Sequence, residues 1–171
     1  MEPIVKPLRG YTPRIGENCY LAENCVIIGD VVMGDNCSVW YNAVIRGDVN
    51  SIRIGNMVNI QDGAVIHCNY KDSVSIIEDN VSIGHNAIIH GARLNKGVLV
   101  GMGAIVMDHA EIGSNSIIAA GAVVSKHTVV EPGSVYAGVP AKKIKQYDPE
   151  HLGRLTNRSA ENYLMYKEWY E

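Results

Sequence analysis

The amino-acid sequence predicts an all-β fold, a parallel β-helix (β-solenoid) of about seven coils with an α-helix at its C-terminal end. Three features predict it: aliphatic residues that recur at every sixth position, glycine and asparagine at fixed places between them, and the loss of this pattern after residue 142. A six-residue interval fits neither the 3.6-residue period of a helix nor the two-residue alternation of a half-buried strand. Three such segments make one coil of about 18 residues, whose aliphatic residues point inward and stack on those of the next coil.

The six-residue register can be followed through nearly the whole predicted solenoid. It slips by three residues after Ile45, is interrupted by an insertion at residues 69–75, and slips by one residue after Ile89. The predicted inward positions are Ile15, Leu21, Ile27, Met33, Val39, Ile45, Ile54, Ile60, Ile66, Ile77, Ile83, Ile89, Leu94, Val100, Val106, Ile112, Ile118, Val124, Val130 and Tyr136. Glycine and asparagine often follow these positions, and both tolerate the positive φ of a tight corner. We therefore expect short strands joined by corners.

The change of pattern near residue 142 divides the chain. We expect a β-helix domain at residues 10–142 and a helical segment at residues 148–171 that packs on it. Asp148, Pro149 and Glu150 are typical of a helix start, with an N-cap side chain, proline at the first position and an acid near the helix dipole. The apolar residues that follow at roughly helical spacing are Leu152, Leu155, Tyr163, Leu164, Tyr166, Trp169 and Tyr170. They predict one or two amphipathic helices along a face of the solenoid.

Composition excludes several classes of function. The chain is 47% hydrophobic with 17 glycines and no phenylalanine, which predicts an aliphatic core. The net charge is −3 and no run of Lys or Arg occurs, so we expect no nucleic-acid partner and no binding to anionic membranes. Residues 1–10 lack an apolar segment and no stretch of 18 apolar residues occurs, so we expect a cytoplasmic protein. In that compartment the four cysteines are expected to be buried thiols rather than disulfides.

Three histidines stand out within this register. His67 and His90 directly follow the inward residues Ile66 and Ile89, so both take the same position in successive coils. Their separation of 23 residues equals one coil plus the five extra residues of the insertion, so we expect them to stack about 5 Å apart. His85 belongs to the middle segment of its coil and lies on another side. In a three-fold assembly of parallel solenoids, that side of one chain could meet the His67 and His90 edge of the next.

Three neutral imidazoles are typical of a catalytic zinc site. They leave one position of a tetrahedral ion open, and such an ion lowers the pKa of its bound water to near 7. Taken singly, each histidine is better explained as a solvated corner residue, but the stacked pair with a third at this spacing favours a metal.

Further polar residues belong to the same region. Arg46 and Asp48 lie one coil before His67, where we expect a structural ion pair across a subunit interface. Asn59 and Gln61 belong to the coil of His67. Gln61 is a candidate to hydrogen-bond the metal-bound water or a carboxylate-like substrate, and the alternative is an amide that satisfies a corner backbone group.

At these residues the chain resembles the γ-class carbonic anhydrases and related hexapeptide-repeat proteins encoded in carnitine and phenylacetate gene clusters. The matching strings are Arg46-Gly47-Asp48, Asn59-Ile60-Gln61-Asp62-Gly63, His67, Gly84-His85-Asn86 and Ile89-His90-Gly91. The resemblance covers about residues 10–171 and implies a left-handed β-helix and a homotrimer. It implies His67, His85 and His90 as ligands of zinc, or of iron or cobalt, between subunits.

The resemblance also assigns roles to the surrounding residues. Arg46 and Asp48 match the interface pair, and Asn59 and Gln61 match residues around the metal-bound solvent. Tyr163 matches a tyrosine of the C-terminal helix that approaches the metal. We therefore predict a metalloprotein, a lyase of the carbonate dehydratase kind, acting on a small molecule such as CO2 or bicarbonate.

Departures from the family keep two alternatives open. The best-studied branch carries glutamates for catalysis and proton export, but this chain has Val49 at one of those places and a short loop, residues 68–72, at the other. Proton transfer from metal-bound water requires a titratable relay, and Asp72 and Glu78 are only weak substitutes, which argues against fast hydration. The string from Ala137 to Lys142 is similar to the ending of acyl-CoA-dependent hexapeptide acyltransferases, the first alternative. The second is a non-catalytic trimeric scaffold.

Overall fold

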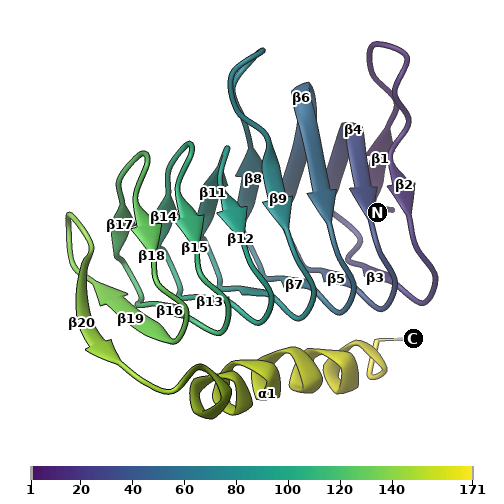
Figure 1. The fold of residues 1–171 in the computed structure, drawn as a ribbon. Helices are drawn as coiled ribbons and strands as arrows, with labels where there is room; N and C mark the ends of the chain where they lie inside the picture. Colours follow the sequence, from purple (N-terminus) through teal and green to yellow (C-terminus); the bar gives the residue numbers. More distant parts are fainter. Residues whose placement is uncertain (1, 171) are drawn as a thin grey trace.

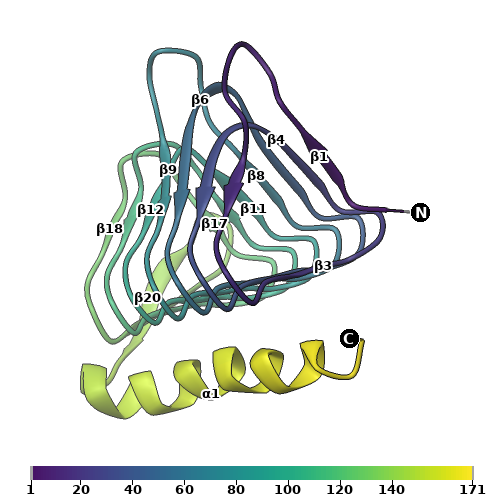
Figure 2. The same ribbon diagram turned by 90° about the vertical axis from the view of Figure 1, so that its right-hand side faces the viewer.

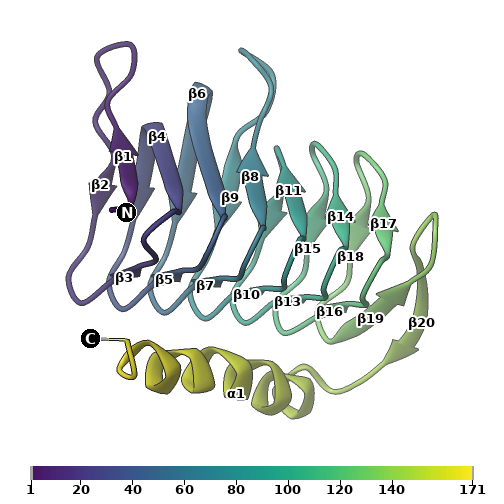
Figure 3. The same cartoon turned by 180° about the vertical axis from the view of Figure 1, so that it is seen from behind.

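The computed structural model describes residues 2–170 as a parallel β-solenoid with one C-terminal helix (Figure 1). Viewed along its axis the solenoid has three sides, and the helix α1 (Pro149–Lys167) lies outside one of them (Figure 2). Seven short parallel strands stack along the side that α1 covers, one for each coil (Figures 1 and 3). The predicted fold class, a β-solenoid of about seven coils with a C-terminal helix, is therefore confirmed.

The strands form two hydrogen-bonded sheets. The helix-covered sheet contains β3 (Tyr20–Leu21), β5 (Ser38–Val39), β7 (Asn59–Ile60), β10 (Ser82–Ile83), β13 (Leu99–Val100), β16 (Ile117–Ile118), β19 (Ser134–Ala137) and β20 (Lys142–Gln146). The other sheet contains β1 (Ile4–Lys6), β2 (Arg14–Ile15), β4 (Val26–Met33), β6 (Val44–Ile54), β8 (Val65–His67), β9 (Ser75–Ile77), β11 (Ile88–His90), β12 (Arg93–Leu94), β14 (Ile105–Val106), β15 (Glu111–Ile112), β17 (Val123–Val124) and β18 (Val129–Val130). The second sheet wraps around two sides, because the long strand β6 pairs with β8 along one half and with β9 along the other.

The core consists of the predicted aliphatic stacks. Parallel pairing places Ile45 beside Ile66, and Ile66 beside Ile89, and all three are fully buried. Three predicted core residues, Ile15, Leu21 and Tyr136, are only half-buried. They belong to the first and last coils, which have a neighbouring coil on one side alone.

Asparagine occupies the corners as the sequence predicted. Asn36 and Asn86 adopt φ of 58° and 57°, in the left-handed region that the tight turn requires. Their amides also join successive coils, since Asn18 Nδ2 donates to Asn36 Oδ1 at 2.7 Å. The insertion after β8 forms a loop at residues 68–74 that projects beyond the neighbouring corners (Figure 1).

The C-terminal segment differs in part from the expectation. Asp148 caps α1 as predicted, accepting hydrogen bonds from the backbone N–H groups of Glu150 and His151. Before it, β20 returns antiparallel along β19 and closes the last coil, which the sequence did not predict. The helix packs through small residues as well as through Leu152: Gly153 and Ala160 are buried, whereas Leu155 is 56% exposed. Small residues carry little periodic signal, so this packing face was not recognised.

Two further expectations can be compared with the structure. Cys19, Cys25, Cys37 and Cys68 are free thiols, and all but the half-buried Cys19 are buried, which agrees with a packing role. Among residues 2–170, no helix combines the length and apolar character needed to cross a membrane.

Candidate metal centre

His67 and His90 lie side by side on the outside of one corner. The strands β8 and β11 pair in parallel, and the register places His67 directly opposite His90. Because Ile66 and Ile89 fill the bore, the next residue on each strand points outward. The ring centroids are 5.2 Å apart, in agreement with the predicted stacking distance. The structure thus presents two imidazoles as a pair.

Each imidazole of this pair is held by a carboxylate from a neighbouring coil. His67 Nε2 lies 2.9 Å from Asp48 Oδ1, and His90 Nδ1 lies 3.0 Å from Asp108 Oδ1. The remaining nitrogens, His67 Nδ1 and His90 Nε2, face each other at 3.2 Å. A histidine that binds a metal typically donates its other ring N–H to a carboxylate in this way.

The facing nitrogens fit a metal ion. When both rings are neutral and both N–H groups are donated to carboxylates, each facing nitrogen carries a lone pair directed at the other. Such an arrangement is favourable only with a proton or a cation between them. Zinc binds histidine nitrogen at roughly 2.0–2.1 Å with tetrahedral angles, which separates two ligand nitrogens by roughly 3.3 Å. The observed separation of 3.2 Å agrees with that geometry.

Asp108 is fixed by a buried network that the sequence analysis missed. Ser73 Oγ donates to its Oδ1 at 2.6 Å, and Asn69 Nδ2 donates to the same oxygen at 2.9 Å. Burial raises the pKa of Asp108, but the bonds from Ser73 and His90 more than offset this, so the pKa is lowered overall. The interval could have revealed this partner, because Asp108 lies 18 residues, or one coil, after His90. Ser73 and Asn69 give the insertion loop a role, which is to hold this carboxylate.

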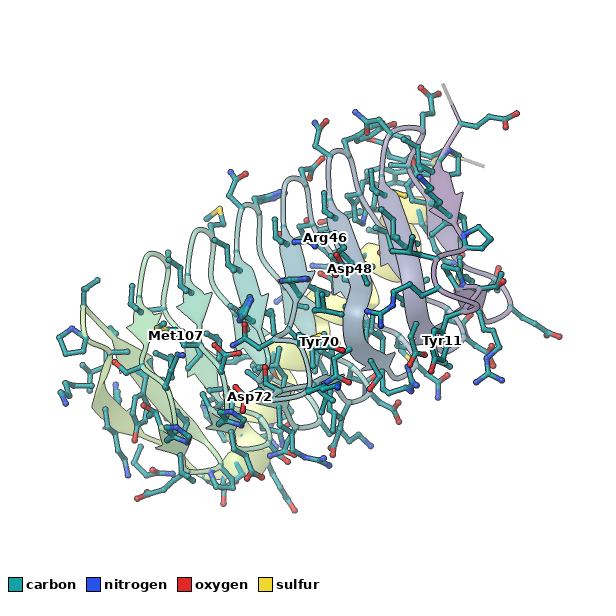
Figure 4. The ribbon with its side chains drawn as sticks, turned by 90° about the horizontal axis from the view of Figure 1, so that it is seen from above. Tyr11, Arg46, Asp48, Tyr70, Asp72 and Met107 are labelled. Atoms are coloured by element: carbon teal, nitrogen blue, oxygen red, sulfur yellow. The ribbon has the colours of Figure 1, made fainter. Side chains whose placement is uncertain are left out.

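Asp48 forms a second carboxylate partner together with Arg46. The two residues lie next to each other on β6 and form an ion pair within one chain (Figure 4). Burial raises the pKa of Asp48, but the hydrogen bonds from His67 and Arg46 outweigh it and lower the pKa overall. An interface role for this pair stays a prediction, whereas its contact with His67 is a feature of the single chain.

His85 lies at another corner. It follows β10 in the turn that leads to β11, and its Nδ1 lies 2.9 Å from Asp62 Oδ2. Its side chain is 41% exposed, compared with 17% for His67. Within residues 2–170 of a single chain, no three histidine, cysteine or acidic side chains come together as a metal site. Asp62 was also missed, although it precedes His85 by 23 residues, the interval that separates His67 from His90.

Asn59 and Gln61 belong to the corner of His85 rather than to the corner of the histidine pair. Gln61 Nε2 donates to Asn59 Oδ1 at 3.0 Å, and Asn59 Nδ2 donates to Ser82 Oγ at 2.8 Å. Both amides are buried. Gln61 and His85 line the same pocket of about 270 Å³ between the solenoid and α1. In the sequence analysis the two amides were grouped with His67 because they share its coil.

Tyr163 also lies on the His85 side of the molecule. It projects from α1 and packs edge-on against Trp40, with ring centroids 5.4 Å apart. Burial, together with the nearby Asp62 carboxylate and Tyr166, raises the pKa of Tyr163 to about 12. The phenol is therefore neutral near pH 7, where it can donate a hydrogen bond but cannot act as a base.

Comparisons with known proteins agree with this architecture. A family model described as bacterial transferase hexapeptide (six repeats) matches residues 12–47 and 91–126. A carbonic anhydrase of Geobacillus kaustophilus is 38% identical, over 98% of this chain and 91% of that protein. A candidate carbonic anhydrase of Methanocaldococcus jannaschii is 47% identical, over 89% of this chain and 92% of its own length. The mitochondrial γ carbonic anhydrase 2 of Arabidopsis thaliana is 36% identical, and the matched region spans only 56% of that longer protein.

Solved structures show the same fold. A hexapeptide transferase family protein from Anaplasma phagocytophilum superimposes with a TM-score of 0.93 at 37% identity, over 100% of both chains. A candidate acetyltransferase from Bacillus cereus superimposes with a TM-score of 0.90 at 34% identity, over 99% of both chains.

The repeats and the three-sided solenoid define the class of this protein, which is a hexapeptide-repeat protein with a paired-histidine corner. Within that class, the relatives at 34–47% identity show that the chain belongs to the γ-carbonic-anhydrase-like family.

Proposed function

We propose that this protein is a γ-carbonic-anhydrase-like enzyme that binds a metal between the subunits of a homotrimer and interconverts CO2 and bicarbonate. The ligands would be His67 and His90 of one chain and His85 of the next. The observation that carries this proposal is the pair of facing imidazole nitrogens, 3.2 Å apart, each on a ring whose other nitrogen is held by a carboxylate. Relatives named carbonic anhydrase support the same activity.

The donor set favours zinc, with iron or cobalt as substitutes. Imidazole nitrogen suits all three ions, and three neutral ligands leave one tetrahedral position open. When bound, such an ion supplies a nucleophile at neutral pH by lowering the pKa of a water molecule to near 7. The carboxylates that hold the rings fix which nitrogen carries the proton, and they balance the charge of a divalent cation.

The remaining residues orient rather than react. Gln61 donates one amide hydrogen to Asn59, and its carbonyl oxygen can accept a hydrogen bond from solvent or substrate in the pocket that also contains His85. The neutral Tyr163 phenol would donate a hydrogen bond to substrate in the same region. Arg46 neutralises the charge of Asp48 and so holds that carboxylate in place for His67.

Residue 49 supplies no acidic group for proton export from this site. Val49 is half-buried and packs against the core, where the best-studied relatives have a glutamate. A positioned general acid or base contributes roughly 10²–10⁴-fold to a rate. We expect slow CO2 hydration in the parent protein and at least a tenfold gain in the Val49→Glu variant.

The deciding experiment is elemental analysis of protein purified without chelator, combined with a CO2 hydration assay. About one zinc, iron or cobalt per chain with measurable, metal-dependent hydration is the expected result. If both the parent protein and the Val49→Glu variant bind metal but neither hydrates CO2, the CO2 assignment is contradicted. Absence of metal that cannot be restored by reloading would contradict the site itself.

Acyl transfer is the second candidate, and the transferase names of the structural relatives favour it. The pocket that contains Gln61 and His85 extends across neighbouring coils to Val100 and Met102, and Ser159 of α1 also lines it. A coenzyme A thioester would lie along such a groove, with His85 as the base. Binding of coenzyme A to chelator-treated protein would distinguish this activity, because CO2 hydration requires the metal and acyl transfer does not.

A further inference from the structure

Aromatic side chains are concentrated at one place outside the solenoid bore. The chain has no phenylalanine, and its core is aliphatic. Both of its tryptophans, Trp40 and Trp169, line a single pocket beside the C-terminal half of α1. The other residues that line this pocket are Tyr41, Asp62, Tyr163, Tyr166 and Tyr170. Its wall therefore consists of six aromatic rings and one carboxylate, and we name it the aromatic pocket.

The rings of this pocket are not stacked on one another. Trp40 meets Tyr163 at 77° and Tyr170 at 86°, with centroids 5.4 Å and 5.3 Å apart. Rings that meet edge to face leave parts of their π faces uncovered. Trp169 and Tyr170 are 70% and 53% exposed, although rings that served only to hold the helix on the solenoid would be buried. The packing of α1 alone does not explain this arrangement.

We propose that the aromatic pocket binds a small organic cation with a quaternary ammonium group. Aromatic faces attract a cation through the ring quadrupole, and quaternary ammonium ligands are recognised in this way because they donate no hydrogen bonds. The carboxylate of Asp62 supplies the complementary charge. None of the lining residues is a lysine or arginine, which argues against an anionic ligand.

The size of the pocket agrees with a small head group. Its volume is about 220 Å³, below the roughly 300–1,000 Å³ of pockets for drug-sized ligands. A primary ammonium is a poorer candidate, because its three N–H donors would require acceptors and it is strongly hydrated. Asp62 is the one acidic side chain in the wall.

This inference goes beyond the proposed function and does not depend on it. Asp62 borders the pocket and also contacts His85, but the cation would be held by rings of the solenoid and α1. Binding can therefore be measured in the trimer after treatment with chelator and in the His90→Ala variant. Binding that persists under both conditions separates this site from the metal centre.

The test uses the tryptophans themselves, since both line the pocket. Intrinsic fluorescence is titrated with choline and with 3,3-dimethyl-1-butanol, which has the same shape but no charge. We expect choline to bind about tenfold more tightly than the neutral alcohol, as cation–π attraction from several rings predicts. Equal affinity for the two, or no binding of choline at millimolar concentration, would overturn the proposal.

Variants locate the site, with binding followed by calorimetry. Trp169→Leu keeps an apolar side chain but removes a π face, and Asp62→Asn removes the charge; each should weaken choline binding about fivefold or more. The matched control is Tyr147→Leu, because Tyr147 is an aromatic residue that packs on His151 at the opposite end of α1. If both pocket variants bind choline as tightly as the parent protein, the cation binds elsewhere and the assignment is overturned. If a trimethyllysine peptide binds and choline does not, the ligand is a protein partner rather than a small molecule, and the proposal is overturned.

Discussion

Both histidine corners of this molecule pair imidazole with carboxylate, but the first contains two imidazoles and the second contains one. At the first corner, His67 and His90 face each other, and the buried Asp108 is fixed by Ser73 and Asn69. At the second, His85 has the Asp62 carboxylate as its ion-pair partner, and both side chains are more than 40% exposed. The first corner presents two imidazoles fixed within one chain, whereas the second presents a single imidazole at the surface. The proposed three-histidine site would therefore need the second corner of another chain.

The first corner is formed within one chain, whereas the role proposed for the second depends on the assembly of chains. The pair depends on strand register within one chain, so its geometry should survive in an isolated subunit. Under the proposed function, the contribution of His85 depends on how chains meet, so it should respond to changes in assembly.

The largest effect is expected from loss of a ligand. His85→Ala and His67→Ala should each reduce metal content to less than about a tenth of the parent value, because two imidazoles hold zinc far less tightly than three. The solenoid should stay folded in His85→Ala, since that side chain is half-exposed. Elemental analysis and circular dichroism measure the two properties.

Mixing of subunits tests the shared site directly. Trimers assembled from His85→Ala and His67→Ala chains contain some interfaces at which all three ligands are intact, so part of the metal binding should return. Mixed trimers that form but bind no metal would show that the ligands do not come from different chains.

The second prediction compares the carboxylates of the two corners. Asp108→Asn should weaken metal binding by about 10- to 100-fold, because it removes a buried partner that orients His90. Asp62→Asn should cost less, since solvent can replace a carboxylate that is 43% exposed. Competition with a zinc-binding dye gives both affinities. An equal loss in the two variants would show that the second corner is as buried in the assembly as the first.

The third prediction concerns the helix that covers the His85 side. A Cβ atom at Gly153 would lie 2.8 Å from the Asn115 side chain, which in turn is packed close to Gly97 and cannot easily move away. Gly153→Ala should therefore destabilise the fold by about 1–2 kcal/mol, despite the better helix propensity of alanine. Urea unfolding measures the change, with Arg158→Ala on the exposed face of α1 as the control. A stabilised variant would show that the helix is free to shift.

The fourth and smallest effect is a shift in alkaline titration. The pKa of Tyr163 is raised to about 12 in the folded protein, compared with about 10 in an unfolded chain. A raised pKa stabilises the fold below pH 10, and this contribution is lost as the pH rises from about 10 through 12. Phenolate absorbance should show a late component that is smaller by one tyrosine in Tyr163→Phe, because burial also raises the pKa of Tyr20 and that residue is unchanged. An unchanged late component in that variant would mean that α1 does not bury the phenol.

The sequence by itself determined the fold and the pairing of two histidines. A period of six residues defines which side chains enter the bore, because each coil repeats the one before it and every inward residue stacks on its counterpart. The register therefore placed Ile66 beside Ile89, and His67 beside His90, with no other information than spacing. The helix start at Asp148 was equally local, since capping involves only neighbouring backbone groups.

Only the tertiary structure decided the surroundings of the histidines. Asp48, Asp62 and Asp108 have no feature in the sequence that marks them as histidine partners, and the contact of each with its histidine appears only when the coils are stacked. The same holds for Gln61, which lies at the corner of His85 although the sequence analysis grouped it with His67. Residue identity and interval determine which side chains stack, but loop insertions and the path of a packed helix determine which side chains meet across corners. Those contacts depend on long-range packing, which a single sequence period does not contain.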